Sequence, residues 1–496
     1  MSKETLKFTR ILFALLITLQ IFTVGSAQDL EVTITITGGD DPSARVEGRF
    51  LSDPKSGSRL NFALAQSAGG MQLSPDRVAE VSLTGSDDTA VSFKKLIPGE
   101  YLASTSYEGW NYRIDLAPPK RSAEAAHSSW FDGSRGLLML NDILPLDAAA
   151  QKAKITLNVP TGSHVIDPAG CDAAPSRTFD IDPAADAVIA IGNNWRNVQL
   201  SGTRGCILIN GAWQFTDAEA AAMAAEVFAV YSRIFSAGPP LSSRIIISGF
   251  PGAPVPHGTW QAETRGTNVT ILSGDMAFRA QSLQRLHEQL RHEIFHLWVP
   301  NSLALTGSYD WFFEGFALYQ ALKTGVEVNR LRFADYLDAL SRARSIDSAM
   351  PIRMSLVDAS KNRWSAGGTQ VYARGMLIAF LTDLALLQKS GGKRSTADLL
   401  RSLSAEHGKG KTPEDGNQAI LSVLSRYPEL KSIADNYVNG TAPVDWSSLL
   451  TASGLEESGP AGRGVLKVSD KLSGKQKEML DKLGYNNWRK ISPRSK

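Results

Sequence analysis

The pattern His292-Glu293-x-x-His296, followed downstream by Glu314, limits what this chain can fold into more than any other feature of the sequence. Two histidines four residues apart lie on one face of an α-helix, one turn from each other, so both imidazoles can bind the same metal ion. Zinc enzymes with such a helix use three protein ligands and keep a fourth position open. Glu314 can be the third ligand only if a second helix crosses the first. We therefore predict one Zn²⁺ per chain, held by His292, His296 and Glu314.

The residues around the motif favour a helical setting. Pro300 predicts the end of the first helix, and Asp310 predicts the N-cap of a second helix that carries Glu314. Glu293 would then face the open coordination position and accept a proton from water, as a catalytic base. The alternative interpretation is that these are ordinary polar residues on two unrelated helices. Apolar residues recur upstream at helical spacing: Leu283, Leu286, Leu290, Ile294 and Leu297.

A second histidine–glutamate pair, His287-Glu288, does not fit a metal site. The residue four positions after His287 is Arg291, and a guanidinium cannot bind a metal cation. The pattern predicts that this pair is solvated helix surface.

The segments HEIFHLW and WFFEGFALY resemble the gluzincin zinc peptidases of the thermolysin-like clan. They most resemble the glycyl aminopeptidase branch, whose members often carry a PDZ domain. The segment Val371-Tyr372-Ala373-Arg374-Gly375 is similar to a tyrosine-x-x-glycine segment of that family. The resemblance implies that Tyr372 donates a hydrogen bond to the oxyanion of the reaction; the alternative is a tyrosine that packs at the edge of the core.

The chain departs from the family in two places. Aminopeptidases of this clan bind the substrate's free amine with a glutamate in a Gly-x-x-Glu segment. Here the segment that begins at Gly258 has Gln261 at that position, and Glu263 follows two residues later on the same face of a strand. Glu263 either binds the amine or faces solvent, so an aminopeptidase and an endopeptidase both remain open. The chain after Trp446 is too short for a complete PDZ domain.

The distribution of strand and helix patterns predicts an α+β multidomain protein. Short alternating runs rich in β-branched residues, beginning with Leu30–Thr37, predict a β-sandwich over 28–208. The capping box Thr216–Glu219 opens a helix in a thermolysin-like α/β zinc catalytic domain, predicted over 209–325, in which Thr267–Leu272 is the edge strand above the cleft. Helical periodicity predicts a C-terminal α-helical domain over 326–450. Residues 451–496 are predicted to be a linker and a short tail.

Export is predicted from the N-terminus. Lys3, Lys7 and Arg10 precede an apolar run and small residues, which indicates a signal peptide over 1–27 and a periplasmic or extracellular location. The run is short for a membrane span, so no stable membrane insertion is expected after cleavage, although an uncleaved anchor is the alternative. In an oxidising compartment the two cysteines, Cys171 and Cys206, would form a disulfide, the alternative being two buried thiols.

Charge and composition narrow the class of partner. The full chain has 52 basic and 50 acidic residues; without 1–27, which holds three basic residues and one acidic residue, both counts become 49. A neutral chain gives no electrostatic reason to bind nucleic acid. We therefore predict a secreted zinc metallopeptidase that acts on peptides or proteins, most simply an aminopeptidase. A zinc endopeptidase and a catalytically inactive peptidase-fold binding protein are the alternatives, and the sequence does not define the oligomeric state.

Overall fold

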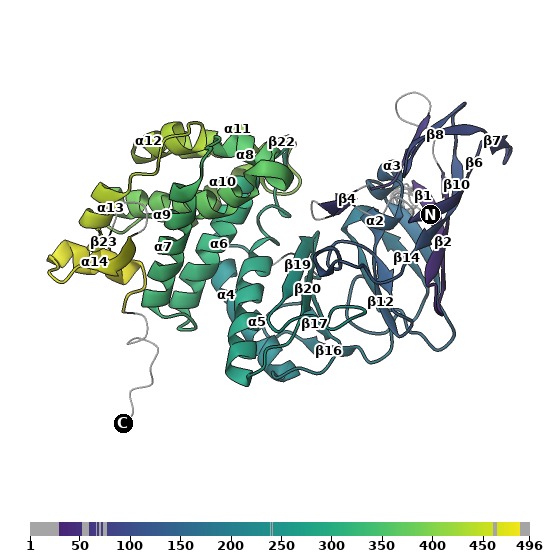
Figure 1. Ribbon diagram of the computed structural model, residues 1–496, viewed down its shortest axis with the longest axis horizontal. Coiled ribbons are helices and arrows are strands. Elements are labelled where there is room, and N and C mark those ends of the chain that lie inside the picture. The colour runs from purple at the N-terminus through teal and green to yellow at the C-terminus, as the bar shows by residue number, and fades with distance from the viewer. Residues whose placement is uncertain are drawn as a thin grey trace, which may run out of the picture.

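The computed structural model describes residues 29–51, 59–65, 67–68, 71–72, 77–238, 240, 242–459 and 464–486. The predicted signal peptide, 1–27, lies outside the described residues. The N-terminal sheets lie at one end of the molecule and helices α7 to α14 at the other, with a five-stranded sheet and α5 between them (Figure 1). The chain is therefore α+β and multidomain, as predicted.

The N-terminal region is built on one large sheet and two small ones. The large sheet has the order β14 (Thr178–Ile181), β13 (Ala153–Asn158), β1 (Leu30–Thr37), β2 (Ser43–Phe50), β10 (Gly109–Asp115), β6 (Val78–Thr84), β7 (Ala90–Val91). The small sheets have the orders β3 (Asn61–Ala63), β9 (Glu100–Ala103), β8 (Phe93–Ile97), and β11 (Trp130–Phe131), β12 (Arg135–Met139), β15 (Val188–Gly192). Short elements complete the region: β4 (Ser67–Ala68), β5 (Met71–Gln72), α2 (Leu140–Ile143), α3 (Leu146–Ala149) and the 3₁₀ turns η1 (Ser122–Glu124) and η2 (Ala184–Asp186).

Alternation along the strands explains why these sheets pack together. In β1 the side chains of Leu30, Val32, Ile34 and Ile36 are buried, and the residues between them face outward. A strand that alternates in this way has one face for a core and one for solvent. One buried cluster takes side chains from all three sheets. The region is thus sheet-rich with a shared core, which agrees with the coarse prediction of packed sheets.

The central sheet contains five strands in the order β16 (Arg196–Gln199), β17 (Cys206–Ile209), β18 (Arg244–Ser248), β20 (Asn268–Ser273), β19 (Trp260–Arg265). β17, β18 and β20 run parallel, and β19 is antiparallel to β20. Helices α4 (Asp217–Phe235) and α5 (Arg279–Phe295) cover one face, where they share a core with Ile245 and Ile247. The other face packs on β12 and β15 through Leu208 and Ile246. Burial on both faces explains the continuous apolar run of β18.

Two predictions about this sheet need correction. The boundary predicted at 208 falls inside β17, and both β16 and β17 belong to the central sheet because their partners are β17 and β18. The predicted edge strand, Thr267–Leu272, corresponds to β20, which is paired on both sides. The strand at the edge is β19, because the chain after it turns back and inserts β20 between β18 and β19.

Helices form the rest of the molecule. They are α6 (Asp310–Glu327), α7 (Phe333–Ala349), α8 (Leu356–Lys361), the π-helical turn η3 (Arg363–Gly367), α9 (Gly368–Ser390), α10 (Thr396–His407), α11 (Gly416–Ser425), η4 (Pro428–Leu430), α12 (Lys431–Ile433), the π-helical turn η5 (Ala434–Val438) and α13 (Ser447–Ala452). Strands β21 (Leu305–Thr306) and β22 (Glu414–Asp415) pair with each other. Helix α9 with its preceding turn, Arg363–Ser390, is long and apolar enough to cross a membrane, but 94% of its most apolar window is buried in the protein. It is the central helix of this core.

The C-terminal segment is packed, so the prediction of a linker and tail is wrong for its described part. Strands β23 (Leu455–Ser458) and β24 (Val465–Val468) form a hairpin, and α14 (Gly474–Lys482) follows. Leu466 and Leu480 join the helical core, and the amide of Leu466 donates to Ser341 Oγ at 2.8 Å. The Gly- and Ser-rich composition of this segment did not indicate that Leu466 and Leu480 are core residues.

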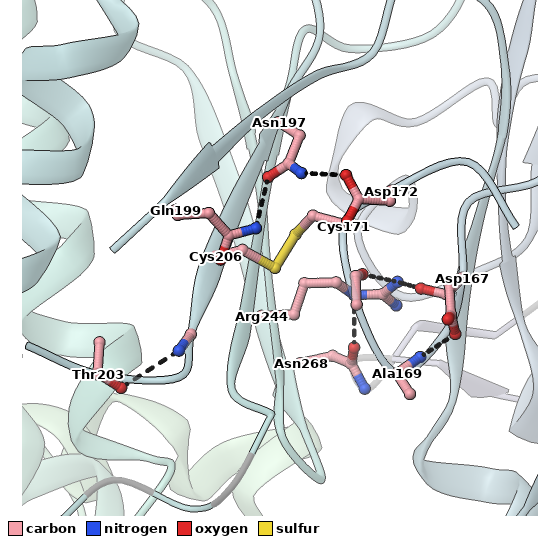
Figure 2. Close-up of a disulfide and its surroundings, with 12 residues drawn as sticks. Asp167, Ala169, Cys171, Asp172, Asn197, Gln199, Thr203, Cys206, Arg244 and Asn268 are labelled. Atoms are coloured by element: carbon pink, nitrogen blue, oxygen red, sulfur yellow. Dashed lines mark hydrogen bonds between the residues drawn. A yellow bond between two sulfur atoms is a disulfide. The ribbon is translucent and has the colours of Figure 1, made fainter. Parts of the chain in front are cut away.

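Cys171 and Cys206 form a disulfide, as predicted (Figure 2). Cys206 begins β17, and Cys171 lies in the loop between β13 and β14, so the bond joins the N-terminal region to the central sheet. The fully buried Arg244 of β18 reinforces this joint. Its Nη1 donates to the carbonyl oxygen of Asp167 at 2.8 Å and its Nε to Asn268 Oδ1 at 3.0 Å. Burial lowers the pKa of Arg244 to about 10.

Candidate active site

The two motif histidines lie at the C-terminal end of α5 and face the same space. His292 Nε2 and His296 Nε2 are 3.3 Å apart. His296 Nδ1 is 3.0 Å from the carbonyl oxygen of Val299, which accepts a hydrogen bond from a protonated Nδ1 and leaves the lone pair on Nε2. The helix ends here because Pro300 cannot continue it.

Glu314 reaches the histidines because α6 and α9 approach unusually closely. A Cβ built on Gly315 would lie 2.5 Å from the Cα of Gly375, so only glycine fits at this crossing. The contact places Glu314, on α6, and Tyr372, on α9, on the same side of α5. Glu314 Oε2 is 3.4 Å from His292 Nε2 and 3.7 Å from His296 Nε2.

These three atoms fit a zinc ion. Ligands about 2.0–2.1 Å from a tetrahedral ion are separated from one another by roughly 3.3–3.4 Å. The separations of 3.3, 3.4 and 3.7 Å are close to that spacing. Two imidazoles and one carboxylate are a typical donor set for catalytic zinc. His292, His296 and Glu314 could therefore hold the metal, and these residues are the only such cluster found among the described residues.

Arg363 contacts Glu314 on the side away from the histidines, and no motif in the sequence marks this arginine. Its Nη2 donates to Glu314 Oε1 at 2.8 Å and to the Tyr372 hydroxyl at 2.6 Å, while Nη1 donates to Asp310 at 2.7 Å. Burial would raise the pKa of Glu314, but His292, His296 and Arg363 hold it at about 2. Asp310 is therefore an ion-pair partner within the first turn of α6, and the prediction that it is the N-cap is wrong: Tyr309 occupies that position.

Tyr372 stays protonated in this setting. Burial and the charge of Glu314 raise the pKa of its hydroxyl above the usual value, although Arg363 opposes them. Arginine can only donate, so the Tyr372 oxygen accepts from Arg363 and its own hydrogen is free to donate elsewhere.

Glu293 is buried, 4% exposed, and is held by a threonine of the edge strand. The hydroxyl of Thr264 lies 2.9 Å from Glu293 Oε2 and 3.0 Å from the Glu293 carbonyl oxygen. This contact fixes the carboxylate next to the histidines, with Oε1 4.0 Å from His292 Nε2. Thr264 was missed because strand alternation alone does not tell which face of β19 meets α5.

One cavity of about 710 Å³ is lined by His292, Glu293, His296, Glu314, Arg363, Tyr372 and Thr264. Its lining residues come from β19, from helices α5, α6 and α7, and from the N-terminal region, which contributes Ala123 and His127. Trp364, which is 59% exposed, stands at its rim and contacts the Arg363 guanidinium. A cavity of this size is in the range of pockets that bind small ligands.

The weaker substrate-binding predictions have different outcomes. Glu263 lines the cavity, so it is not simply solvent-facing, and Gln261 lines it too. Glu263 Oε2 is 2.7 Å from His127 Nδ1, and Oε1 accepts from Arg265. Burial would raise the pKa of Glu263, but its contacts with His127 and Arg265 lower it. Gly258 is not among the lining residues; it lies in the turn before β19 with φ +75°.

His287 contradicts the prediction of a solvated pair, because it is 1% exposed. Its Nε2 lies 3.0 Å from Glu226 Oε2, and its Nδ1 lies 2.8 Å from Arg291 Nη1. Helix α4, which supplies Glu226, covers this face of α5. The sequence of α5 alone could not show that another helix lies there.

Comparison with solved structures identifies the class of fold. The fold of the chain is similar to that of many solved structures, and 120 chains match it. One is an aminopeptidase N family protein from Idiomarina loihiensis, with a TM-score of 0.69 and 16% identity over 87% of this chain and 80% of that one. Another is an M1 zinc metallopeptidase from Deinococcus radiodurans bound to a Tyr-Ser-Ala substrate, with a TM-score of 0.56 and 13% identity over 84% and 95% of the two chains.

At these identities the similarity shows the fold alone. No protein-family model matches the chain, and no curated protein sequence matches it.

Proposed function

We propose that this protein is an exported zinc metallopeptidase and that it acts as an aminopeptidase. The observation that carries the proposal is the convergence of His292, His296 and Glu314 at metal-ligand spacing beside a buried glutamate, Glu293, in one cavity. The shared fold with M1 zinc peptidases and the disulfide support it. Zinc bound here would polarise the scissile carbonyl and lower the pKa of a coordinated water towards 7.

The chain's own residues supply the proton transfers. Glu293 accepts a proton from the attacking water and passes it to the leaving amine. Thr264 keeps the carboxylate in place for both steps. Tyr372 donates its free hydrogen to the oxyanion that forms on the substrate carbonyl, and Arg363 orients that hydroxyl. A substrate that lies along the open edge of β19 would extend the central sheet by backbone hydrogen bonds.

The end of the cavity at β19 favours an aminopeptidase over an endopeptidase. Glu263 presents a half-buried carboxylate there, held by His127 and Arg265, and a free amine is the natural cation for it. His127 comes from the N-terminal region, which also contributes Ala123 to the lining of the cavity. An endopeptidase would need the cavity to continue past these residues.

The test combines metal analysis with peptide turnover. We expect one zinc per chain and hydrolysis of peptides with a free N-terminus, with selective loss when the same peptides are N-blocked. Equal rates on blocked peptides would indicate an endopeptidase. Protein without zinc or turnover would support a binding protein that only shares the fold.

Replacing the base checks the roles of the residues. Glu293→Gln should retain zinc and lose most turnover, because the amide cannot accept the proton. Glu314→Ala should lose zinc on dialysis. Unchanged turnover in the first variant, or full zinc occupancy in the second, would contradict the assigned roles.

A further inference from the structure

Arg291 is a buried cation on the wall of the cavity, and the proposed reaction does not use it. It precedes the first motif histidine on α5, is 4% exposed, and lines the cavity together with Glu288. Its guanidinium lies against α6, since a Cβ on Gly325 would come within 2.8 Å of Nη1 and 2.9 Å of Cζ. The charge is therefore placed on the side of the cavity that α5 and α6 form.

The contacts of Arg291 leave part of the guanidinium without a partner. Nη1 is 2.8 Å from Nδ1 of His287, whose Nε2 is bound by Glu226. Among the described residues, no carboxylate lies within 4 Å of the guanidinium, and neither Nε nor Nη2 has a hydrogen-bond partner. Glu288, the nearest acidic lining residue in sequence, pairs with Arg285. A buried charge without a counter-ion is strongly unfavourable.

The surroundings of Arg291 are apolar, which strengthens any ion pair formed there. The lobe of the cavity next to it, here called the α6–α7 lobe, is lined by Leu318 and Leu322 of α6, Ala339 of α7 and Met376 of α9. Leu318 lies one turn beyond Glu314 on α6, so the lobe begins beside the metal ligands. Burial also lowers the pKa of Arg291, although Tyr231, Glu288 and Glu226 oppose that shift.

We propose that the α6–α7 lobe binds a carboxylate of the substrate, with Arg291 as its counter-ion. The inference rests on the proposed peptidase function. With the free amine at the β19 end, the lobe receives the part of the substrate that follows the scissile bond. The carboxylate is then an acidic side chain in that part or the free C-terminus of a short peptide. A substrate without one leaves Arg291 unpaired and is disfavoured.

The experiment compares matched peptides that share a free N-terminus. In the first pair the two peptides have the same sequence, and one ends in a free C-terminal carboxylate and the other in an amide. In the second pair both peptides end in an amide, and the residue after the scissile bond is Glu in one and Gln in the other. We expect kcat/KM to be about tenfold or more higher for at least one carboxylate member, the usual scale for a hydrogen bond to a charged group. The pair that shows the preference identifies the source of the carboxylate. Equal rates within both pairs would overturn the proposal, while hydrolysis itself would still support the peptidase.

Two variants separate the charge from the packing. Arg291→Met keeps the length of the side chain and should reduce the preference to near one. The matched control is Arg330→Met, because Arg330 also binds Glu226, at 3.1 Å, but does not line the cavity. The control should keep the preference. If Arg291→Met keeps the preference for the carboxylate peptide, Arg291 is not the counter-ion and the proposal is refuted. If that variant fails to fold, the proposal is decided by the kcat/KM ratios that the unmodified protein shows within the two peptide pairs.

A binding measurement makes the outcome independent of turnover. Glu293→Gln protein loaded with zinc is titrated with the acid and amide members by calorimetry. Tighter binding of a carboxylate member supports the proposal, and equal binding or none overturns it. Binding without any hydrolysis by the unmodified protein would instead contradict the peptidase function while leaving the carboxylate site supported.

Discussion

Arg363 links three groups of the site through one guanidinium: Glu314, Asp310 and Tyr372. Because the Tyr372 oxygen accepts from Arg363, its hydrogen has one direction in which to donate. We expect Tyr372→Phe to lower kcat by about 10²–10³-fold, the scale for loss of one oxyanion donor, with KM and zinc content little changed. Steady-state kinetics and metal analysis test this. Wild-type rates in the phenylalanine variant would remove Tyr372 from the mechanism.

Thr264 acts through Glu293, so we regard it as a positioning residue. Thr264→Val keeps the shape of the side chain and removes the hydroxyl. We expect kcat to fall about tenfold or more, because a hydrogen bond to a carboxylate is lost, whereas KM should change little. Thr264→Ser restores the hydroxyl and should restore kcat. If valine and serine variants show the same kcat, the hydroxyl has no positioning role.

At the scale of elements, Asp383 of α9 connects three helices. Its carboxylate accepts from Lys323 of α6 at 2.5 Å, from the hydroxyl of Tyr319 at 2.6 Å and from the amide of Thr396, at the start of α10, at 2.8 Å. The residue is fully buried. Removing one partner of such a network leaves the others uncompensated, so Asp383→Ala should lower the free energy of unfolding by about 3 kcal/mol or more. Denaturant unfolding measures this.

The same carboxylate gives a pH dependence of stability. Burial would raise the pKa of Asp383, but Lys323, Tyr319 and Thr396 lower it overall. A carboxyl group whose pKa is lower in the folded state stabilises the protein above its unfolded pKa of about 3.9 and loses that contribution as the pH falls through the folded value. The Asp383→Ala variant should therefore lose less stability on acidification than the wild type. Equal losses would count against this assignment.

Elements with a strong local pattern were predicted well. The capping box at Thr216 opens α4, as predicted. The strand Leu30–Thr37 is β1 itself. The C-terminal hairpin was missed, because strands as short as Leu455–Ser458 have little periodicity and form only when a core is there to receive them.

At the scale of the whole molecule, the joint between the N-terminal region and the central sheet decides the shape of the cavity. His127 enters the cavity from one side of this joint and Glu263 from the other. The disulfide and Arg244 hold the two sides together (Figure 2). Because the disulfide restricts the unfolded chain, we expect it to contribute to the stability of this joint.

A double variant tests that expectation. Replacing both Cys171 and Cys206 with Ser removes a bond between positions 35 residues apart. In the chain-entropy model this should lower the free energy of unfolding by about 3–4 kcal/mol. Denaturant unfolding of the variant and of the reduced wild type should agree. An unchanged midpoint in both would show that the packing of the joint suffices without the bond.

The sequence by itself determined that His292 and His296 face the same space, because helical periodicity places residues i and i+4 on one face whatever surrounds the helix. It also marked Glu314 as the candidate third ligand and Glu293 as the candidate base. The pattern of apolar residues also predicted the strand-rich N-terminal region and the helical region that follows the central sheet, but not the packed C-terminal segment. Only the tertiary structure decided which strand forms the edge of the central sheet, that Arg363 and Thr264 orient Tyr372 and Glu293, and that Arg291 is buried beside the cavity. The physical reason is that these contacts join residues far apart in the chain, and their geometry depends on how whole elements cross, as at Gly315 and Gly375.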